Sequence, residues 1–310
     1  MGTENKVLIV LVLTFLGIFV TSVIIGIFMN SSLNVSTANR ILPTTTTTST
    51  TTTTTLPSLS ALLASASVSR TFNSTIAFSG IRTLAIGTVN NIQYNLVQDY
   101  NVGVFFFDTN WQYVSTFTYP NAYYVIVANN LFYFTMSTGS YGIIATTLTS
   151  TAIVYSSSQP LTYRSAVYDQ AGGKIIAANF GGLSVETFDL TLRLLSSVSL
   201  PANPHGVTLF NSNIYVSLWS VATILVISNG VISNTYPTQC TNVASLTFDS
   251  FGNMLLPCFT NSVVYLYDTS INYLNQNINT NNAPANPLYA GMDISGRLAI
   301  AGYSYIYIYQ

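Results

Sequence analysis

The sequence has little of the residues that carry most enzyme and nucleic-acid chemistry. Charged residues make up 5% of the 310 residues, the formal net charge is −1, and there is one histidine. A typical soluble protein has about 25% charged residues. Because no run of lysine or arginine occurs, the chain lacks the basic patch that nucleic-acid binding needs. We therefore expect no nucleic-acid partner.

Turn chemistry explains most of the nine acidic residues. Two hairpin-turn types recur, in which a carboxylate can bond the backbone of its own turn, and they contain Asp108, Asp169, Asp189, Asp249, Asp268 and Asp293. Glu4 lies before the apolar run at 7–29 and outside the repeats. The two remaining acidic residues, Asp99 and Glu186, lie on different repeats. Paired catalytic carboxylates or a metal site need side chains that converge. We therefore predict no catalytic residue, no metal ligand and no cofactor.

Residues 7–29 form an uncharged apolar run. At about 1.5 Å per residue it spans roughly 34 Å, enough for a hydrocarbon core of about 30 Å. The alternative is a cleaved signal peptide, whose apolar region is shorter, about 7–15 residues. Lys6 precedes the run and no positive residue follows before Arg40, so the positive-inside rule places residues 1–6 in the cytoplasm and the rest outside. We predict one N-terminal transmembrane helix in a single-pass membrane protein.

Residues 30–68 have the composition of a stalk. A Thr tract at 44–55 contains one Ser and is flanked by prolines, which is typical of O-glycosylated segments that form no core. Sequons for N-glycosylation begin at Asn30, Asn34 and Asn73. The segment is therefore expected to be a glycosylated spacer.

Residues 69–310 repeat with a period near 40, which is typical of propeller blades. The clearest unit reads as four strands at 244–248, 254–259, 263–267 and 272–274, separated by turn residues. We predict blades at 81–119, 120–160, 161–200, 201–239 and 240–280, with an incomplete blade at 281–310. A strand at 71–77 would complete the last blade and remove its exposed edge. The pattern predicts an all-β, six-bladed β-propeller; five or seven blades are the alternatives if a boundary is misplaced.

Two stretches carry a family resemblance. PHGVTLFNSNIYVS at 204–217 and FDSFGN at 248–253 resemble the repeats of NHL and YVTN-type propellers. The resemblance implies a propeller scaffold and no particular function. In composition, but in no motif, the chain resembles surface proteins of thermoacidophilic archaea and of their viruses.

Propeller geometry predicts one face for a binding site. Loops that join blades share a face with loops between second and third strands, and this predicted binding face contains Tyr100, Tyr141, Tyr163, Arg164, His205, Trp219 and Tyr303. Aromatic rings with few charges suit sugar stacking or a protein interface. The alternative is that these residues reflect only the 13% aromatic content, with His205 an ordinary loop histidine.

Cys240 and Cys258 are the two cysteines. Outside the cell a disulfide is expected, and it would close a loop worth about 3 kcal/mol. Counted from the turn between them, the cysteines are out of direct register, so two buried thiols are the alternative.

The sequence thus favours a membrane-anchored extracellular recognition or adhesion module that binds a surface glycan or protein, on a cell or a virion. A structural envelope or surface-layer component is the first alternative. An enzyme acting on glycans is the second, which the distribution of acidic residues disfavours.

Overall fold

The computed structural model describes residues 70–71, 76–158, 161–268, 270–279 and 286–309. They belong to a compact unit at 55–310. The predicted transmembrane segment, the Thr-rich stalk and the sequons at Asn30, Asn34 and Asn73 lie outside the described residues. In the part of the chain that is described, no helix is long and apolar enough to cross a membrane.

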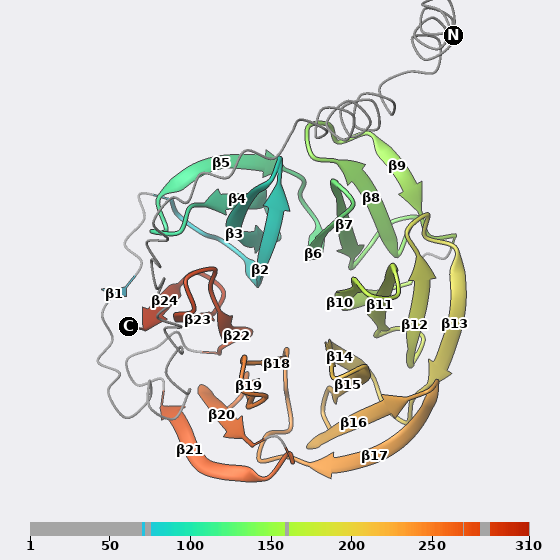
Figure 1. The fold of residues 1–310 in the computed structure, drawn as a ribbon, viewed down its shortest axis with the longest axis vertical. Helices are drawn as coiled ribbons and strands as arrows, with labels where there is room; N and C mark the ends of the chain where they lie inside the picture. The colour runs from blue at the N-terminus through green and yellow to red at the C-terminus, as the bar shows by residue number, and fades with distance from the viewer. Residues whose placement is uncertain (1–69, 72–75, 159–160, 269, 280–285, 310) are drawn as a thin grey trace, which may run out of the picture. The chain divides into compact units, whose positions relative to one another are not determined.

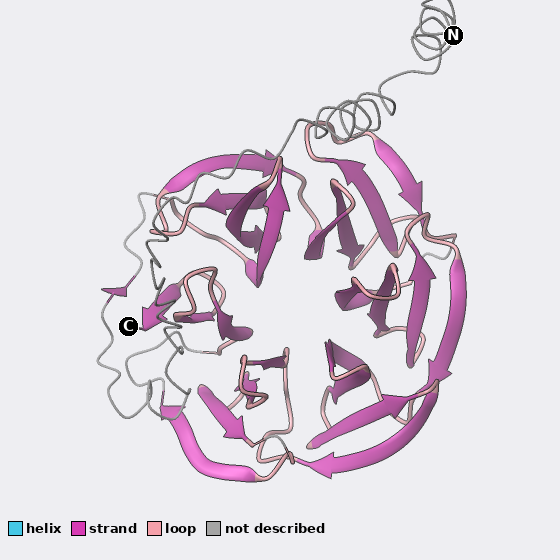
Figure 2. Cartoon of the chain, in the orientation of Figure 1, coloured by secondary structure: helices cyan, strands magenta, loops and turns pink. Residues whose placement is uncertain are grey.

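The described residues form six four-stranded antiparallel sheets around a common centre (Figure 1). Strands and loops make up these residues, without helices (Figure 2). The fold is the six-bladed β-propeller that the sequence predicted. In the first five blades the first strand lies nearest the centre and the fourth lies outermost, and in the sixth β22 lies nearest the centre and β1 outermost (Figure 1).

The strands follow one another blade by blade. The first blade contains β2 (Ile81–Val89), β3 (Ile92–Asp99), β4 (Gly103–Phe107) and β5 (Tyr113–Thr118). The second contains β6 (Ala122–Ala128), β7 (Leu131–Met136), β8 (Ile143–Thr147) and β9 (Ile153–Ser156). The third contains β10 (Tyr163–Asp169), β11 (Lys174–Asn179), β12 (Ser184–Asp189) and β13 (Leu194–Ser199).

The second half of the propeller has the same arrangement. The fourth blade contains β14 (Pro204–Phe210), β15 (Asn213–Leu218), β16 (Thr223–Ser228) and β17 (Val231–Pro237). The fifth contains β18 (Thr247–Phe248), β19 (Met254–Cys258), β20 (Val263–Tyr267) and β21 (Tyr273–Asn279). The sixth contains β22 (Tyr289–Met292), β23 (Leu298–Ala301), β24 (Ile306–Tyr309) and the N-terminal β1 (Arg70–Thr71).

The N-terminal strand closes the propeller. Arg70 pairs with Ile308 and Thr71 with Tyr307, antiparallel to β24. The closing strand therefore begins one residue before the predicted range of 71–77, of which 72–75 lie outside the described residues. Closure gives the last blade its fourth strand and covers the backbone edge of β24.

The turns form as their aspartates predict. Asp249 Oδ1 accepts hydrogen bonds from the backbone N–H of Phe251 and Asn253, at 2.9 and 2.8 Å. Asp268 Oδ1 accepts from the equivalent N–H groups, those of Ser270 and Asn272. In the first turn the left-handed position is Gly252 (φ 85°), and in the second it is the buried Ile271 (φ 61°). The recurring aspartates are therefore turn residues, as expected.

Apolar packing between neighbouring blades forms the core. Six separate clusters of buried residues occur, each joining the sheets of two adjacent blades, including the sixth and the first. Because successive strand residues point to opposite faces, each sheet contributes to the clusters on both of its sides. This packing fixes the inner strands, and the candidate site is built at one end of them.

Candidate functional site: an arginine–aromatic cluster

Four inner strands begin with the same irregularity. In β2, β6, β10 and β14 the pairing register shifts across one residue near the start of the strand, as in a β-bulge. The residues skipped by the shifts are Arg82, Tyr123, Arg164 and His205. A bulge residue is left out of the ladder and its side chain is re-aimed. Successive blades therefore present four large polar or aromatic side chains from equivalent positions.

Loops at the same end of the blades supply the rest of the site. Each loop joins the second strand of a blade to the third, and the five residues concerned are Tyr100, Phe180, Trp219, Phe259 and Tyr303. We name these nine residues the arginine–aromatic cluster: Arg82, Tyr100, Tyr123, Arg164, Phe180, His205, Trp219, Phe259 and Tyr303.

Arginines and aromatic rings alternate on one side of the cluster. The Arg82 Cζ lies 5.2, 5.1 and 4.8 Å from the ring centroids of Tyr100, Tyr123 and Tyr303. The Arg164 Cζ lies 4.3 Å from the Tyr123 centroid and 4.9 Å from that of Phe180. Both guanidinium groups therefore contact the same tyrosine, which lies between them.

Aromatic contacts complete the circuit. The His205 ring stacks on Trp219 with centroids 4.7 Å apart, Trp219 contacts Phe259 at 5.9 Å, and Phe259 contacts Tyr303 at 5.8 Å. The His205 ring also meets Phe180 edge to face at 6.3 Å. Tyr303 contacts Arg82 in turn, so the contacts pass through residues of all six blades and return to the first.

The two arginines have no carboxylate partner among the described residues. The ion pairs there join Arg193 to Asp189 and Arg297 to Asp293. The Nε atoms of Arg82 and Arg164 are buried and have no hydrogen-bond partner in the described part of the chain.

The two acidic residues outside the recurring turns are bonded elsewhere. Asp99 accepts hydrogen bonds from the backbone N–H of Ser79, Gly80 and Asn101, at 2.8, 3.0 and 2.9 Å. Asp99 therefore ties the segment before β2 to the β3–β4 loop.

Glu186 is buried in the third blade. It accepts hydrogen bonds from Asn179 Nδ2 at 2.9 Å, from Ser184 Oγ at 3.1 Å and from the Tyr163 hydroxyl. Its oxygens are thus occupied by internal donors, and it lies two blades away from Asp99.

His205 is a neutral imidazole at ordinary pH. Burial is the main cause that lowers its pKa from 6.5 to about 4; the hydrogen bond to the Ala244 carbonyl opposes this effect, and the charges of Arg164 and Arg82 add to it. Because that carbonyl only accepts, Nδ1 donates to it, and in the neutral tautomer Nε2 is the acceptor nitrogen. The positive charge of the cluster therefore comes from the two arginines.

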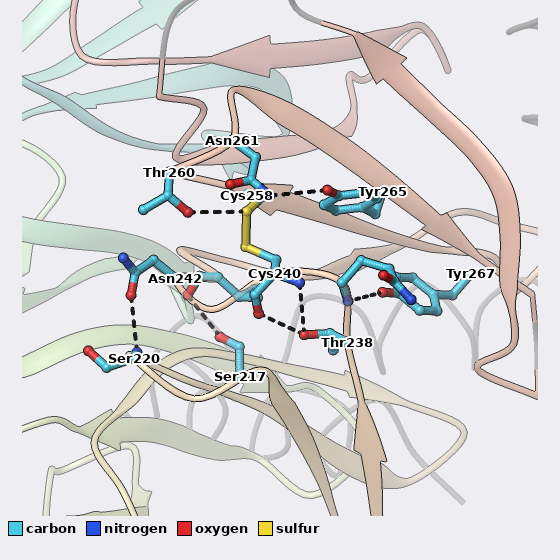
Figure 3. Close-up of a disulfide and its surroundings, with 12 residues drawn as sticks. Ser217, Ser220, Thr238, Cys240, Asn242, Cys258, Thr260, Asn261, Tyr265 and Tyr267 are labelled. Atoms are coloured by element: carbon cyan, nitrogen blue, oxygen red, sulfur yellow. Dashed lines mark hydrogen bonds between the residues drawn. A yellow bond between two sulfur atoms is a disulfide. The ribbon is translucent and has the colours of Figure 1, made fainter.

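A disulfide and one asparagine hold the loops between the fourth and fifth blades (Figure 3). Cys240 and Cys258 are bonded, with their Cα atoms 5.7 Å apart. Asn242 forms isolated bridge pairing with Trp219, its Oδ1 accepts from the Ser220 N–H at 3.2 Å, and its carbonyl accepts from the Phe259 N–H at 3.0 Å. The disulfide thus cross-links the segment that positions Trp219 and Phe259.

The fifth blade departs from the predicted strand at 244–248. Its inner strand covers only Thr247–Phe248, because the residues before it form isolated contacts instead: Val243 pairs with Cys258, and the Ala244 carbonyl bonds to His205. This irregular course brings Cys240 beside Cys258 although the two are out of register in a regular hairpin.

Five of the seven residues of the predicted binding face belong to the cluster: Tyr100, Arg164, His205, Trp219 and Tyr303. Tyr163 does not. It is 1% exposed and packs edge to face on Phe188, because it keeps its place in the ladder opposite Asn179 and the bulge re-aims only Arg164. Tyr141 is exposed on the β7–β8 loop and has no ring contact within the described residues.

Sequence reasoning missed four members of the cluster: Arg82, Tyr123, Phe180 and Phe259. A signal for the first two exists in the spacing, since Arg82, Tyr123, Arg164 and His205 follow one another at intervals of about 41 residues.

Among the described residues no group of three or more His, Cys, Asp or Glu could hold a metal ion.

No known protein family and no curated protein matches the sequence. Among solved structures, the chain is similar to a streptogramin B lyase, with 14% identity, a TM-score of 0.60, and coverage of 78% of this chain and 96% of the other. A catalytically inactive virginiamycin B lyase from Staphylococcus aureus with quinupristin has 12% identity, a TM-score of 0.57, and coverage of 74% and 80%. A protein of unknown function from Bacteroides caccae has 12% identity, a TM-score of 0.51, and coverage of 65% and 82%. At these identities the likeness is one of fold alone.

Proposed function

We propose that this chain is a membrane-anchored extracellular recognition protein that binds a surface glycan or protein through the arginine–aromatic cluster. The observation that carries the proposal is the circuit of contacts that draws residues from all six blades to one end of the inner strands. The composition of residues 1–68 supports the anchor and the glycosylated stalk, and with this anchor the propeller would lie outside the cell or virion.

The exposure of the cluster suits a ligand that stacks on aromatic faces. Tyr303 is 37% exposed, and Tyr100, Trp219 and Phe259 are partly exposed. Tryptophan and tyrosine provide large rigid contact surfaces, and both recur where proteins bind sugars or other proteins. A β-propeller scaffold often mediates binding, and contacts among these rings and with the side chains of the inner strands hold them together without a ligand.

The test is binding of the purified full chain, reconstituted in lipid nanodiscs, to intact cell surfaces before and after enzymatic removal of their glycans. The site variant carries Trp219→Ala and Tyr303→Ala. The control variant carries Tyr113→Ala, which removes an exposed tyrosine from the outer strand β5. Saturable binding that the site variant loses and the control keeps would support the proposal. Equal binding by all three proteins would refute it.

A structural envelope component is the second candidate, and the outer strands favour it. Four of them begin with neighbouring exposed apolar residues: Tyr113 and Val114, Ile153 to Tyr155, Leu194 and Leu195, and Val231 and Ile232. None of these strands contains a charged residue, although charges on edge strands normally prevent edge-to-edge association. Assembly that depends on protein concentration, measured by sedimentation and abolished by Leu194→Lys with Val231→Lys, would support this candidate.

An enzyme built on the same site is a further reading, because two similar structures are lyases by name and His205 supplies a neutral imidazole. Incubation of the full chain with quinupristin, followed by mass spectrometry, tests it. Product that forms with the unaltered chain and not with His205→Asn would support an enzyme.

A further inference from the structure

The cluster combines two kinds of surface. Arg82, Tyr123 and Arg164 form an arc in which two positive charges flank one aromatic ring. Trp219, Phe259 and Tyr303 form an arc of rings that contact one another. One arc suits an anion, and the other suits an apolar or sugar-ring face.

The positive arc lacks any internal counter-charge among the described residues. Both acidic groups on these blades outside the turns, Asp99 and Glu186, have their oxygens bonded by internal donors. The other described arginines with side-chain contacts, Arg193 and Arg297, pair with aspartates. Among the arginines whose side chains the structure describes, the two left without an acid are therefore the two that flank Tyr123 in the cluster.

Aromatic contacts hold the guanidinium groups without using their hydrogen bonds. A cation over an aromatic face is stabilised electrostatically, but the N–H donors in the plane of the guanidinium stay available. Leaving a buried donor without a partner is unfavourable, and this is the condition of Nε in Arg82 and in Arg164. Both residues are partly exposed overall although Nε is buried, so a ligand oxyanion would reach each guanidinium group from its exposed side.

We propose that Arg82 and Arg164 bind the oxyanion of an acidic sugar in the ligand, with the sugar's apolar face against Trp219 or Tyr303. This inference rests on the proposed recognition function and adds the chemical class of its ligand. A guanidinium presents a fork of donors that matches a carboxylate or a sulfate. The carboxylate of a uronic acid and the sulfate of a sulfated sugar share this chemistry, and the experiment separates them.

The experiment is calorimetric titration of the purified full chain with three soluble probes. Trigalacturonic acid carries carboxylates, galactotriose of the same linkage replaces each carboxylate by a hydroxymethyl group, and a sulfated galactose trisaccharide carries sulfates. Binding of an acidic probe at least tenfold tighter than galactotriose, weakening as salt is raised, is the expected result. The acidic probe that binds tighter identifies the oxyanion.

Variants locate the binding. Arg82→Gln and Arg164→Gln are each expected to weaken the acidic probe about 10- to 100-fold, because a hydrogen bond to a charged group is lost. Arg193→Gln removes the same charge from an exposed side chain outside the cluster and is expected to leave affinity unchanged. Arg82→Lys and Arg164→Lys keep the charge and the fold while removing the fork, so they keep the inference testable if a glutamine variant unfolds.

Two outcomes would overturn the inference. One is equal affinity for trigalacturonic acid, the sulfated probe and galactotriose, and the other is full affinity for the acidic probe in both glutamine variants. Neither outcome overturns the recognition function, which is decided separately by cell-surface binding of the Trp219 and Tyr303 variant. Acidic-sugar binding can therefore fail while recognition stands.

Discussion

Loss of the Cys240–Cys258 cross-link is expected to destabilise the propeller by about 3 kcal/mol. The bond closes a loop with a sequence separation of 18 residues, and the chain entropy that such a closure removes from the unfolded state gives this magnitude. Both cysteines are buried, at 1% and 0% exposed, so truncation adds a small cavity cost. For a unit of this size, about 3 kcal/mol corresponds to roughly 6–12 °C in the melting temperature.

The assay is urea unfolding of the full chain, comparing the unaltered protein with Cys240→Ala, Cys258→Ala and the double variant. Each single variant loses the cross-link and gains one cavity, and the double variant gains only the second cavity. The difference between the double variant and Cys240→Ala therefore measures the cavity cost at Cys258, and subtracting that cost from the effect of Cys258→Ala isolates the cross-link. An isolated cross-link contribution below about 1 kcal/mol would refute the reasoning.

The remaining predictions concern pH, a buried turn and closure. The folded-state pKa of His205 is about 4, so between about pH 6.5 and pH 4 the unfolded chain binds a proton that the folded chain does not. Roughly 3 kcal/mol of the free energy of unfolding is therefore lost as pH falls through this range. His205→Asn should flatten this part of the pH–stability profile. Asp293→Ala should lower the free energy of unfolding in urea by about 3–5 kcal/mol. Asp293 is 5% exposed, and its carboxylate accepts a hydrogen bond from Trp111 Nε1 at 2.8 Å and pairs with Arg297. Asp189→Ala, at an exposed turn in which the aspartate likewise bonds the N–H groups two and four residues on, should lower it by about 1 kcal/mol or less. Removal of β1 should lower the melting temperature and cause association visible by light scattering, because β24 then has a free backbone edge; an unchanged monomer would contradict this role.

The fold was predictable because its signals are local and repeated. An aspartate whose carboxylate bonds the N–H groups two and four residues on marks a turn wherever it occurs, as at Asp249 and Asp268. The strand-and-turn pattern as a whole repeats with a period near 40, and that period gives the number of blades. Neither inference depends on knowing which side chains meet across the molecule.

The cluster was harder to predict because a single bulge decides which of two neighbours joins it. In a regular strand, neighbouring residues point to opposite faces, and a shift of one residue exchanges them. Tyr163 and Arg164 illustrate this: both were predicted on the binding face, but Tyr163 stays in the ladder and in the core. Bulges depend on packing around the strand as well as on its sequence, so local pattern does not locate them.

Long-range contacts also set the course of the segment before β18. The residues at 244–248 predict a strand by composition, yet Val243 pairs with Cys258 and the Ala244 carbonyl accepts from His205 of the neighbouring blade. These partners are distant in sequence, so the local pattern overestimates the strand. The same contacts bring the two cysteines together, which explains why counting from the hairpin turn left their pairing open.

The repeated bulge links the architecture to the proposed function. A regular inner strand would alternate its side chains between the two neighbouring blades and add only to the core clusters. One skipped residue at the start of β2, β6, β10 and β14 frees a side chain from that packing while the rest of the strand stays in register. Because the blades hold the bulges at equivalent positions, the freed side chains converge, and two of them are arginines for which the described residues provide no acid. An uncompensated buried charge destabilises a core, and the acidic ligand proposed above would supply the missing anion.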